Sequence, residues 1–282
     1  MRIAVVGTGG VGGYFGGLLA RSGEDVIFIA RGEHLAAIRR NGLRVKSIHG
    51  DFVVAPAQAT DNPSTIGPVD LVLLTTKTYQ LDEAVRQMAP LLGAHTIVLP
   101  LQNGVDAADR VVALLAGSGK GQPAGRAGSP PSGPSPVLGG ACWVVSAVTE
   151  PGVITQQSHF RRIVVGELGQ PGASGSVSPR VQAIVAALTR AGATAEASPD
   201  IRKVLWTKFL FIACYSGLGA VTRVPAGELM ASAEVRAVLE QAMTEVAAVA
   251  KAEGVELDPD VVPQTMTFCA NLEPGATASM QR

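Results

Sequence analysis

The sequence predicts an α/β fold, a doubly wound parallel sheet followed by an all-α C-terminal domain. Short apolar strand patterns alternate with helical patterns over the first two thirds of the chain, which is typical of a parallel sheet covered by helices on both faces. After Asp200, helical pattern follows helical pattern without a strand between them. We therefore expect two domains, residues 1–198 and residues 199–282.

The first strand and the first helix enclose a glycine cluster. Residues 3–6 are an apolar strand pattern, and residues 14–21 are a helical pattern of small side chains. Between them the chain reads GxGxxG, through Gly7, Thr8, Gly9, Gly10, Val11 and Gly12. In such a loop the first glycine allows the tight turn, the second admits a pyrophosphate, and the third lets helix and strand pack closely.

Free N–H groups at the start of the following helix bind phosphate, so the cluster predicts a Rossmann-type dinucleotide site. The alternatives are an ordinary glycine-rich turn and a secretion signal. Five glycines fall within the apolar region that a signal would need, which argues against the second alternative.

The second strand, residues 25–30, indicates which dinucleotide binds. An NAD site carries Asp or Glu roughly 20 residues beyond the glycines, where the carboxylate holds the ribose 2′-hydroxyl. Here the position is Arg31, whose guanidinium suits a 2′-phosphate through paired, charge-assisted hydrogen bonds. NADP is therefore favoured over NAD. Glu33 and His34 follow directly, which leaves a mixed preference for the two cofactors open. The alternative interpretation of Arg31 is a solvated loop charge.

Composition limits the function further. With 282 residues, 47% of them apolar and 16% charged, the chain can bury a large core. A formal net charge of zero and the absence of a basic stripe argue against nucleic acid and anionic membranes as partners. Cys142, Cys214 and Cys269 are odd in number and far apart, as expected of reduced thiols in a cytoplasmic protein. The scattered histidines predict no metal site, and nothing indicates the oligomeric state.

The remaining elements follow in order. We expect strands at residues 70–75, 96–100, 142–148, 162–166 and 194–197, and helices at residues 81–92 and 179–191. Residues 116–136 are rich in Gly, Pro and Ser and cannot bury apolar surface, so we expect a disordered surface insertion. In the second domain we expect helices at residues 201–218 and 233–254, a turn at 222–227 and a further helix start at Asp258. The apolar stretch 209–221 is shorter than the roughly 20 residues of a membrane span and predicts a buried core helix.

Polar residues follow the third and fourth strands, where ligands of open α/β sheets bind. Lys77 follows one strand, and its ammonium suits a phosphate, a ribose or a substrate carboxylate. Asn103 follows the other, and its amide suits the nicotinamide ribose or the substrate, with Gly104 allowing close approach. The alternatives are ordinary turn chemistry for the Asn-Gly pair and a simple helix-start lysine for Lys77.

Lys208 lies within the apolar helical pattern of residues 206–212. A lysine among such neighbours either extends its ammonium to the surface or is held in a cleft for use. Hydride addition to a ketone places negative charge on oxygen, which an ammonium stabilises and protonates. Ser216 lies two turns further along the same face, with Ile212 between them. From the residues alone, both interpretations of Lys208 stay open.

Taken together, the chain resembles the ketopantoate reductase (2-dehydropantoate 2-reductase) family from its first residue to its last. The resemblance rests on the order and spacing of the glycine cluster with Arg31 and of residues 76–80, 102–104, 150–154, 205–208 and 278–281. It implies NADPH-dependent reduction of 2-dehydropantoate to (R)-pantoate, a step toward pantothenate and coenzyme A. It also assigns roles: Lys208 as general acid, Lys77 and Asn103 in the cofactor and substrate pocket, Ser279 on the substrate, and Ser146 beside the cofactor.

The sequence departs from the family pattern in two places. The family often carries asparagines one and two turns after the lysine, where this chain has Ile212 and Ser216. We assign Ser216 to the substrate by that position, and the loss of an amide at Ile212 leaves another branched 2-oxo acid open as substrate. The resemblance also implies an acidic stretch beyond Arg282 that carries a substrate-binding glutamate, so we expect either a fragment or an atypical end of the second domain. The remaining alternative is a nucleotide-binding protein without turnover.

Overall fold

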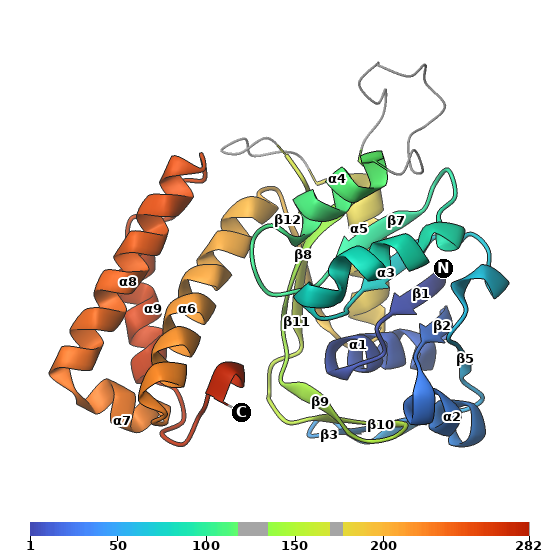
Figure 1. The fold of residues 1–282 in the computed structure, drawn as a ribbon, viewed down its shortest axis with the longest axis horizontal. Helices are drawn as coiled ribbons and strands as arrows, with labels where there is room; N and C mark the ends of the chain where they lie inside the picture. Colours follow the sequence, from blue (N-terminus) through green and yellow to red (C-terminus); the bar gives the residue numbers. More distant parts are fainter. Residues whose placement is uncertain (118–134, 170–176, 282) are drawn as a thin grey trace. The chain divides into compact units, whose positions relative to one another are not determined.

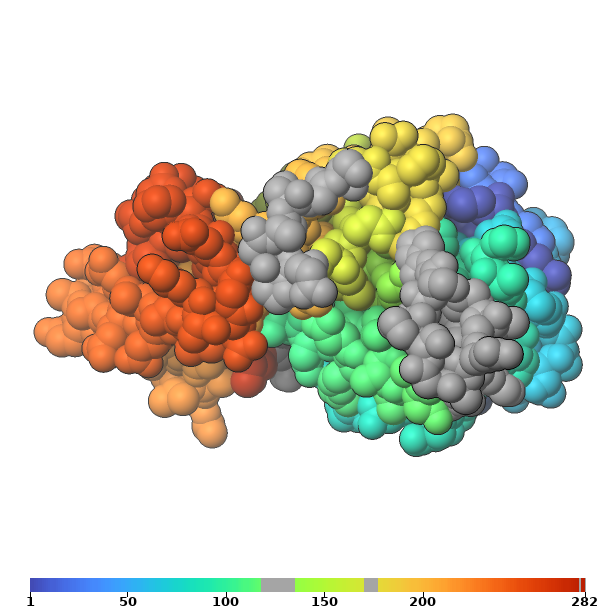
Figure 2. Space-filling model, turned by 90° about the horizontal axis from the view of Figure 1, so that it is seen from above, coloured from blue at the N-terminus to red at the C-terminus, as the bar shows by residue number. Residues whose placement is uncertain are grey.

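The computed structural model describes residues 1–117, 135–169 and 177–281, which are coloured in Figure 1 and Figure 2. The expected insertion at residues 116–136 lies almost wholly outside the described residues. The described chain divides into two compact units. Of the described residues, the first unit contains 1–168 and 177–201. The second unit contains Gly169 and the residues from Arg202 onward.

The first unit is built on a parallel sheet of five strands in the order β5-β2-β1-β6-β7. These strands are β1 (Arg2–Val6), β2 (Asp25–Ile29), β5 (Gln58–Thr60), β6 (Leu71–Leu74) and β7 (Ile97–Pro100). Strand β1 is central, because Ile3 pairs in parallel with Val26 on one side and with Leu71 on the other. The predicted doubly wound α/β fold is confirmed.

Alternate side chains of the strands build two apolar layers on opposite faces of this sheet. Ile3 and Val5 pack into the layer that contains α1 (Gly10–Arg21) and α5 (Pro179–Arg190). Ala4 and Val6 pack into the layer of α3 (Leu81–Gln87) and α4 (Ala107–Gly117). Helix α2 (Gly32–Asn41) follows β2 (Figure 1). Because both faces are covered, the strands read as continuous apolar runs.

Two further sheets were not predicted. One has the order β4-β3-β10-β9, from β4 (Phe52–Val54), β3 (Leu43–Ser47), β10 (Val153–Gln156) and β9 (Ser146–Glu150). The other has the order β12-β11-β8, from β12 (Thr194–Ser198), β11 (Arg162–Glu167) and β8 (Leu138–Trp143). The expected strand at residues 142–148 is wrong, because β8 pairs with β11 whereas β9 pairs with β10. The chain changes sheet between Trp143 and Ser146.

Glycines on α1 allow the β4-β3-β10-β9 sheet to approach it. A Cβ atom at Gly13 would lie 2.6 Å from the side chain of Ile154, and one at Gly17 would lie 3.2 Å from Val45. The small residues of this helix therefore serve packing as well as the turn before it.

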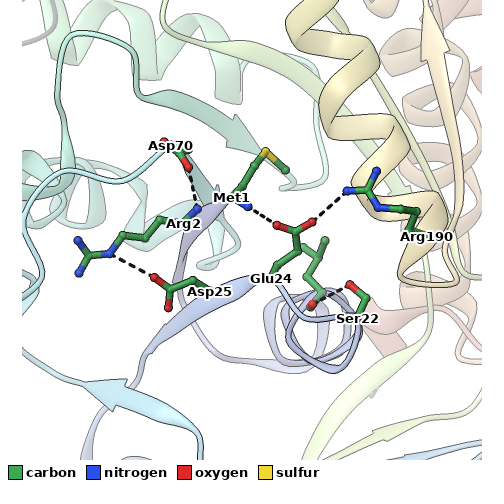
Figure 3. Close-up of polar contacts among 8 residues, drawn as sticks. Met1, Arg2, Ser22, Glu24, Asp25, Asp70 and Arg190 are labelled. Atoms are coloured by element: carbon green, nitrogen blue, oxygen red, sulfur yellow. Dashed lines mark hydrogen bonds and ion pairs between the residues drawn. The ribbon is translucent and has the colours of Figure 1, made fainter.

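The edge of the central sheet at which the strands begin is occupied by paired charges (Figure 3). The Arg2 backbone N–H donates to Asp70 at 2.7 Å, and the Arg2 side chain pairs with Asp25 at 3.6 Å. Glu24 accepts hydrogen bonds from the Met1 amino group and from Arg190, the latter at 3.1 Å. The charged groups at this edge thus satisfy one another.

Two helices of the first unit differ clearly from expectation at one end. Helix α1 begins at Gly10, inside the glycine cluster, rather than at residue 14. The helix expected at residues 81–92 ends at Gln87 and continues as the 3-10 turn η3 (Ala89–Leu91). Pro90 explains the break, since it lacks the N–H that an α-helix needs there.

The second unit is helical, with α6 (Ile201–Thr222), α7 (Ala226–Ala231), α8 (Ala233–Ala252), α9 (Val261–Ala270) and the 3-10 turn η4 (Ser279–Gln281). The turn expected at residues 222–227 instead leads into α7. In the described residues, α6 is the helix whose length and hydropathy match a membrane span. A buried core helix passes the same test, and Leu210 and Tyr215 of α6 pack with Leu239 and Met243 of α8.

Candidate functional site

The glycine cluster forms a closely packed turn between β1 and α1. Gly7 has a φ of +96°, which favours glycine, and a Cβ atom there would lie 2.8 Å from the backbone nitrogen of Thr76. A Cβ atom at Gly12 would lie 2.3 Å from the hydroxyl of Thr75. That hydroxyl donates to the Gly7 carbonyl at 2.7 Å. The end of β6 therefore fixes the shape of the loop.

Two neighbouring glycines in this loop face different surroundings. A Cβ atom at Gly10 would lie 2.1 Å from the Ser146 carbonyl oxygen, so β9 closes that side of the loop. No atom of the described residues lies within 4 Å of the position that a Cβ atom at Gly9 would take. Gly9 is the N-cap of α1, and the first N–H groups of a helix have no partner within the helix. Open space beside such groups fits a dinucleotide pyrophosphate.

Arg31 is exposed at the N-cap of α2, directly after β2. Its guanidinium donates to the side-chain oxygen of Gln87 on α3. His34, in the first turn of α2, accepts a hydrogen bond from the Gly152 N–H at Nδ1. Burial lowers the pKa of His34, against a smaller opposing effect of the Thr8 backbone. The imidazole is therefore neutral at pH 7, and Arg31 is the cationic side chain of this turn.

Polar residues follow the strands β6 and β7 at the same edge of the sheet. Lys77 is exposed and precedes the 3-10 turn η2 (Thr78–Gln80). Asn103 is exposed after β7. Gln102, one residue earlier, is buried, and its Nε2 donates to the carbonyls of Leu74 and Thr76, each at 3.1 Å. This edge therefore presents both exposed and buried polar groups.

Several buried oxygens at this edge lack partners. Among the described side chains, the Thr76 hydroxyl, the Gln102 amide oxygen and the Ser146 hydroxyl are buried without a hydrogen-bond partner. Thr76 lies beside Gly7, and Ser146 lies beside Gly10. The Gln102 side chain is hydrogen-bonded to the carbonyl of Thr76. Buried polar groups in native proteins are nearly always hydrogen-bonded, so unpaired groups around one loop indicate a polar ligand. The residues present fit a dinucleotide.

In the helical unit, Lys208 and Ser216 lie on α6 and are buried, at 7% and 5% exposure. Ile212, one turn after Lys208, is half-buried. Ser279 begins η4, but its side chain lies outside the described part of the structure. A buried ammonium is unusual and requires favourable surroundings, so Lys208 is a candidate for chemistry rather than for solubility.

An apolar groove of about 520 Å³ lies between α6 and α8, lined by residues such as Trp206, Phe209 and Val246. Glu245 also lines it. Burial, with a smaller contribution from Glu245, raises the pKa of the Cys214 thiol to about 11. The thiol therefore stays protonated at neutral pH and is not a nucleophile.

The structure thus gathers Gly7–Gly12, Arg31, Lys77, Asn103 and Ser146 around one edge of the sheet, and it places Lys208, Ser216 and the Ser279 backbone in the helical unit. Sequence reasoning placed Thr75, Thr76 and Gln102 in the polar runs at this edge but assigned them no role of their own. The polar run after each apolar strand was a signal for them, but their hydrogen bonds depend on the fold.

Comparison with known proteins gives a consistent match over both units. The family model described as ketopantoate reductase PanE/ApbA matches residues 3–170, and the model of its C-terminal part matches residues 200–282.

The chain is similar to individual relatives over most of their length. A 2-dehydropantoate 2-reductase of Mesorhizobium japonicum is 34% identical over 90% of this chain and 77% of its own. An uncharacterized oxidoreductase of Bacillus subtilis, YkpB, is 28% identical over 100% of this chain and 85% of its own. The crystal structure of a 2-dehydropantoate 2-reductase from Geobacter metallireducens is 30% identical, with a TM-score of 0.85, over 100% of this chain and 86% of that chain.

Proposed function

The chain belongs to the ketopantoate reductase family, and we propose that it reduces 2-dehydropantoate to (R)-pantoate with NADPH, toward pantothenate and coenzyme A. The family supplies the oxidoreductase class and the Rossmann-type fold. The choice of NADPH, the substrate and the residue roles are the proposal. Buried Lys208 is the observation that carries the proposed catalytic activity.

The first unit holds the cofactor. The N–H groups at the start of α1, beside the open space at Gly9, bind the pyrophosphate. Arg31 binds the 2′-phosphate through charge-assisted hydrogen bonds. Ser146 lies beside the bound cofactor, and Lys77 and Asn103 contact both cofactor and substrate. NADPH, when bound, supplies a hydride to the keto carbon of the substrate.

Lys208 is the general acid. As the keto carbon is reduced, negative charge builds on its oxygen, and the Lys208 ammonium stabilises that charge and gives up a proton to it. Burial of Lys208 strengthens this interaction, because charges interact more strongly away from water. Ser216 and Ser279 hold polar groups of the substrate.

A second substrate remains a candidate, and Ile212 favours it. An isoleucine one turn after Lys208 cannot donate to or accept from a substrate hydroxyl. Another branched 2-oxo acid without a hydroxyl suits this position better than 2-dehydropantoate does.

The test is NADPH oxidation, followed by absorbance, against a panel of 2-oxo acids. The proposal expects kcat/KM to be highest with 2-dehydropantoate. A higher value with 2-oxoisovalerate, which lacks the hydroxyl, would favour the second candidate. Tight NADPH binding with no oxidation on any acid would leave a nucleotide-binding protein and reject the proposed reaction.

A further inference from the structure

The side chain of Gln102 is held in one orientation. Both partners of its Nε2 atom, at 3.1 Å each, are carbonyl oxygens, of Leu74 and Thr76. A carbonyl can only accept a hydrogen bond, so the nitrogen of the planar amide must face these two oxygens. The amide oxygen therefore faces away from both. It is buried and, within the described residues, has no partner.

Thr96, at the other end of β7, shows what a purely structural side chain does in this sheet. Its hydroxyl donates to the carbonyl of Val69 at 2.6 Å and accepts from the Gly93 N–H at 2.8 Å. Thr96 is 4% exposed and Gln102 is 7% exposed. Both side chains donate to backbone carbonyls, and the Thr96 hydroxyl also accepts a hydrogen bond. The Gln102 amide oxygen, in contrast, accepts none from the described residues, and it lies at the edge of the sheet assigned to the ligand.

Sheet order gives the part of a dinucleotide that reaches this acceptor. In the order β5-β2-β1-β6-β7, Arg31 follows β2 on one side of the glycine loop, and Gln102 follows β7 on the other. A dinucleotide lies across this edge with its pyrophosphate at the central loop. With the 2′-phosphate at Arg31, the nicotinamide half lies over the ends of β6 and β7.

We infer that the Gln102 amide oxygen accepts a hydrogen bond from the carboxamide N–H of the nicotinamide, making Gln102 a cofactor-positioning residue. The NH₂ group of the carboxamide can only donate, so it matches the Gln102 amide oxygen, which can only accept. This hydrogen bond satisfies the unpaired oxygen of Gln102 and fixes the rotation of the nicotinamide ring. This inference rests on the proposed NADP site, but not on the identity of the 2-oxo acid.

Ligand binding to the unmodified protein gives the first test. The 3-acetylpyridine analogue of NADP carries a methyl group where the carboxamide has its NH₂, and it should bind more weakly than NADP, by about 5- to 20-fold, as expected for the loss of one buried hydrogen bond. Adenosine 2′,5′-bisphosphate, which lacks the nicotinamide half, reports the Arg31 side alone. Equal affinities for NADP and the analogue would overturn the inference.

Substitution gives the second test. Gln102→Met, of similar size but without the acceptor, should weaken NADP binding about 5- to 20-fold, and the analogue and the bisphosphate should bind as they do to the unmodified protein. Gln102→Asn, which withdraws the oxygen by one methylene, replaces it should the Met variant not fold.

The matched control is Thr96→Val, which removes bonds to backbone carbonyls at the opposite end of β7. It should lower Tm and leave the three affinities unchanged. Equal weakening of all three ligands by Gln102→Met, or no weakening of NADP, would show a structural or water-bound amide and reject the inference. If the unmodified protein shows the expected ligand affinities but reduces no 2-oxo acid, the proposed reaction is rejected and the role of Gln102 is retained.

Discussion

The side chains of Arg31 and Gln87 are hydrogen-bonded to each other, although Arg31 is the N-cap of α2 and Gln87 is the last residue of α3. The Gln87 amide in turn donates to Glu83 at 2.5 Å, and Glu83 pairs with Arg86 at 3.0 Å. The guanidinium that we assign to the 2′-phosphate is therefore oriented by a helix on which it does not lie.

Arg31→Asp should remove the preference for NADPH over NADH or reverse it. One bidentate, charge-assisted contact contributes about 1.5–3 kcal/mol, which corresponds to a change in the ratio of the two Kd values of roughly 10- to 150-fold. Fluorescence titration with both cofactors measures it. Arg40→Asp makes the same charge change at an exposed position of the same helix and should leave the ratio unaltered. Equal Kd values in the unmodified protein would contradict the assignment of Arg31.

Gly9→Ala and Gly10→Ala should have different consequences. A methyl group at Gly9 enters open space, and its backbone, at a φ of −88°, suits alanine, so Tm should stay within about a degree or two. NADPH binding should fall at least about tenfold, because the methyl group takes the place of the pyrophosphate.

A methyl group at Gly10 instead meets the Ser146 carbonyl at 2.1 Å. The loop or β9 must shift, which should cost about 1–3 kcal/mol of stability as well as cofactor affinity. Thermal unfolding with and without NADPH separates the two effects. A stable Gly9→Ala protein with normal NADPH affinity would show that the pyrophosphate does not bind beside Gly9.

Lys208→Ala should lower kcat by roughly 10²- to 10⁴-fold, the usual contribution of a positioned general acid. NADPH should still bind, because the residues assigned to the phosphates lie in the first unit. The control is Lys203→Ala on the same helix, which removes an ion pair with Asp258 at 2.6 Å and should leave kcat unchanged. A Lys208→Ala protein with normal kcat and altered Tm would reduce this lysine to a structural role.

The ion pair between Glu167 and Arg180 should make stability depend on pH. Burial alone would raise the pKa of Glu167, but hydrogen bonds from Arg180 and Ser178 outweigh burial and lower it. A lowered pKa in the folded protein stabilises it fully above the unfolded value, near 4.3, and the stabilisation is lost as pH falls through the folded pKa.

Glu167→Gln should therefore lower Tm most at pH 7, and the difference from the unmodified protein should shrink below about pH 4. Differential scanning calorimetry from pH 3 to pH 8 measures it. Glu150→Gln, which breaks an exposed pair with Lys46 at 3.7 Å, should change Tm little at any pH. A constant Tm difference for Glu167→Gln across this range would exclude the ion pair as its cause.

The elements that the sequence predicted well are those defined by neighbouring residues. Strand β1, the glycine loop, strand β2 and Arg31 follow one another within a single βαβ unit, so their pattern is local. The resemblance in motifs likewise identified the family. The β4-β3-β10-β9 sheet was missed because strands such as β3 (LRVKS) and β9 (SAVTE) are not continuous apolar runs like those of the central sheet, and pairing rather than pattern defines them.

Side-chain details at the site were out of reach for a related reason. Asn103 and Gln102 look alike in the sequence as polar residues after a strand. Only the fold shows that Asn103 is exposed and that Gln102 is buried with its amide nitrogen on two carbonyls. The carbonyls belong to another strand, and no spacing within the chain predicts which side chain will face them.

The pairing of β3 with β10 has a consequence for synthesis. Ser47 and Gln156 are hydrogen-bonded at 2.7 Å but stand 109 residues apart in the chain. At roughly 5–20 residues per second, the ribosome needs roughly 5–20 s to make what lies between them. Throughout that interval Val45 and Phe52 lack the β-strand that completes their sheet. The nascent chain therefore displays an open strand edge and an uncovered apolar surface long before its partner emerges, which makes it a natural client for chaperones that act during translation.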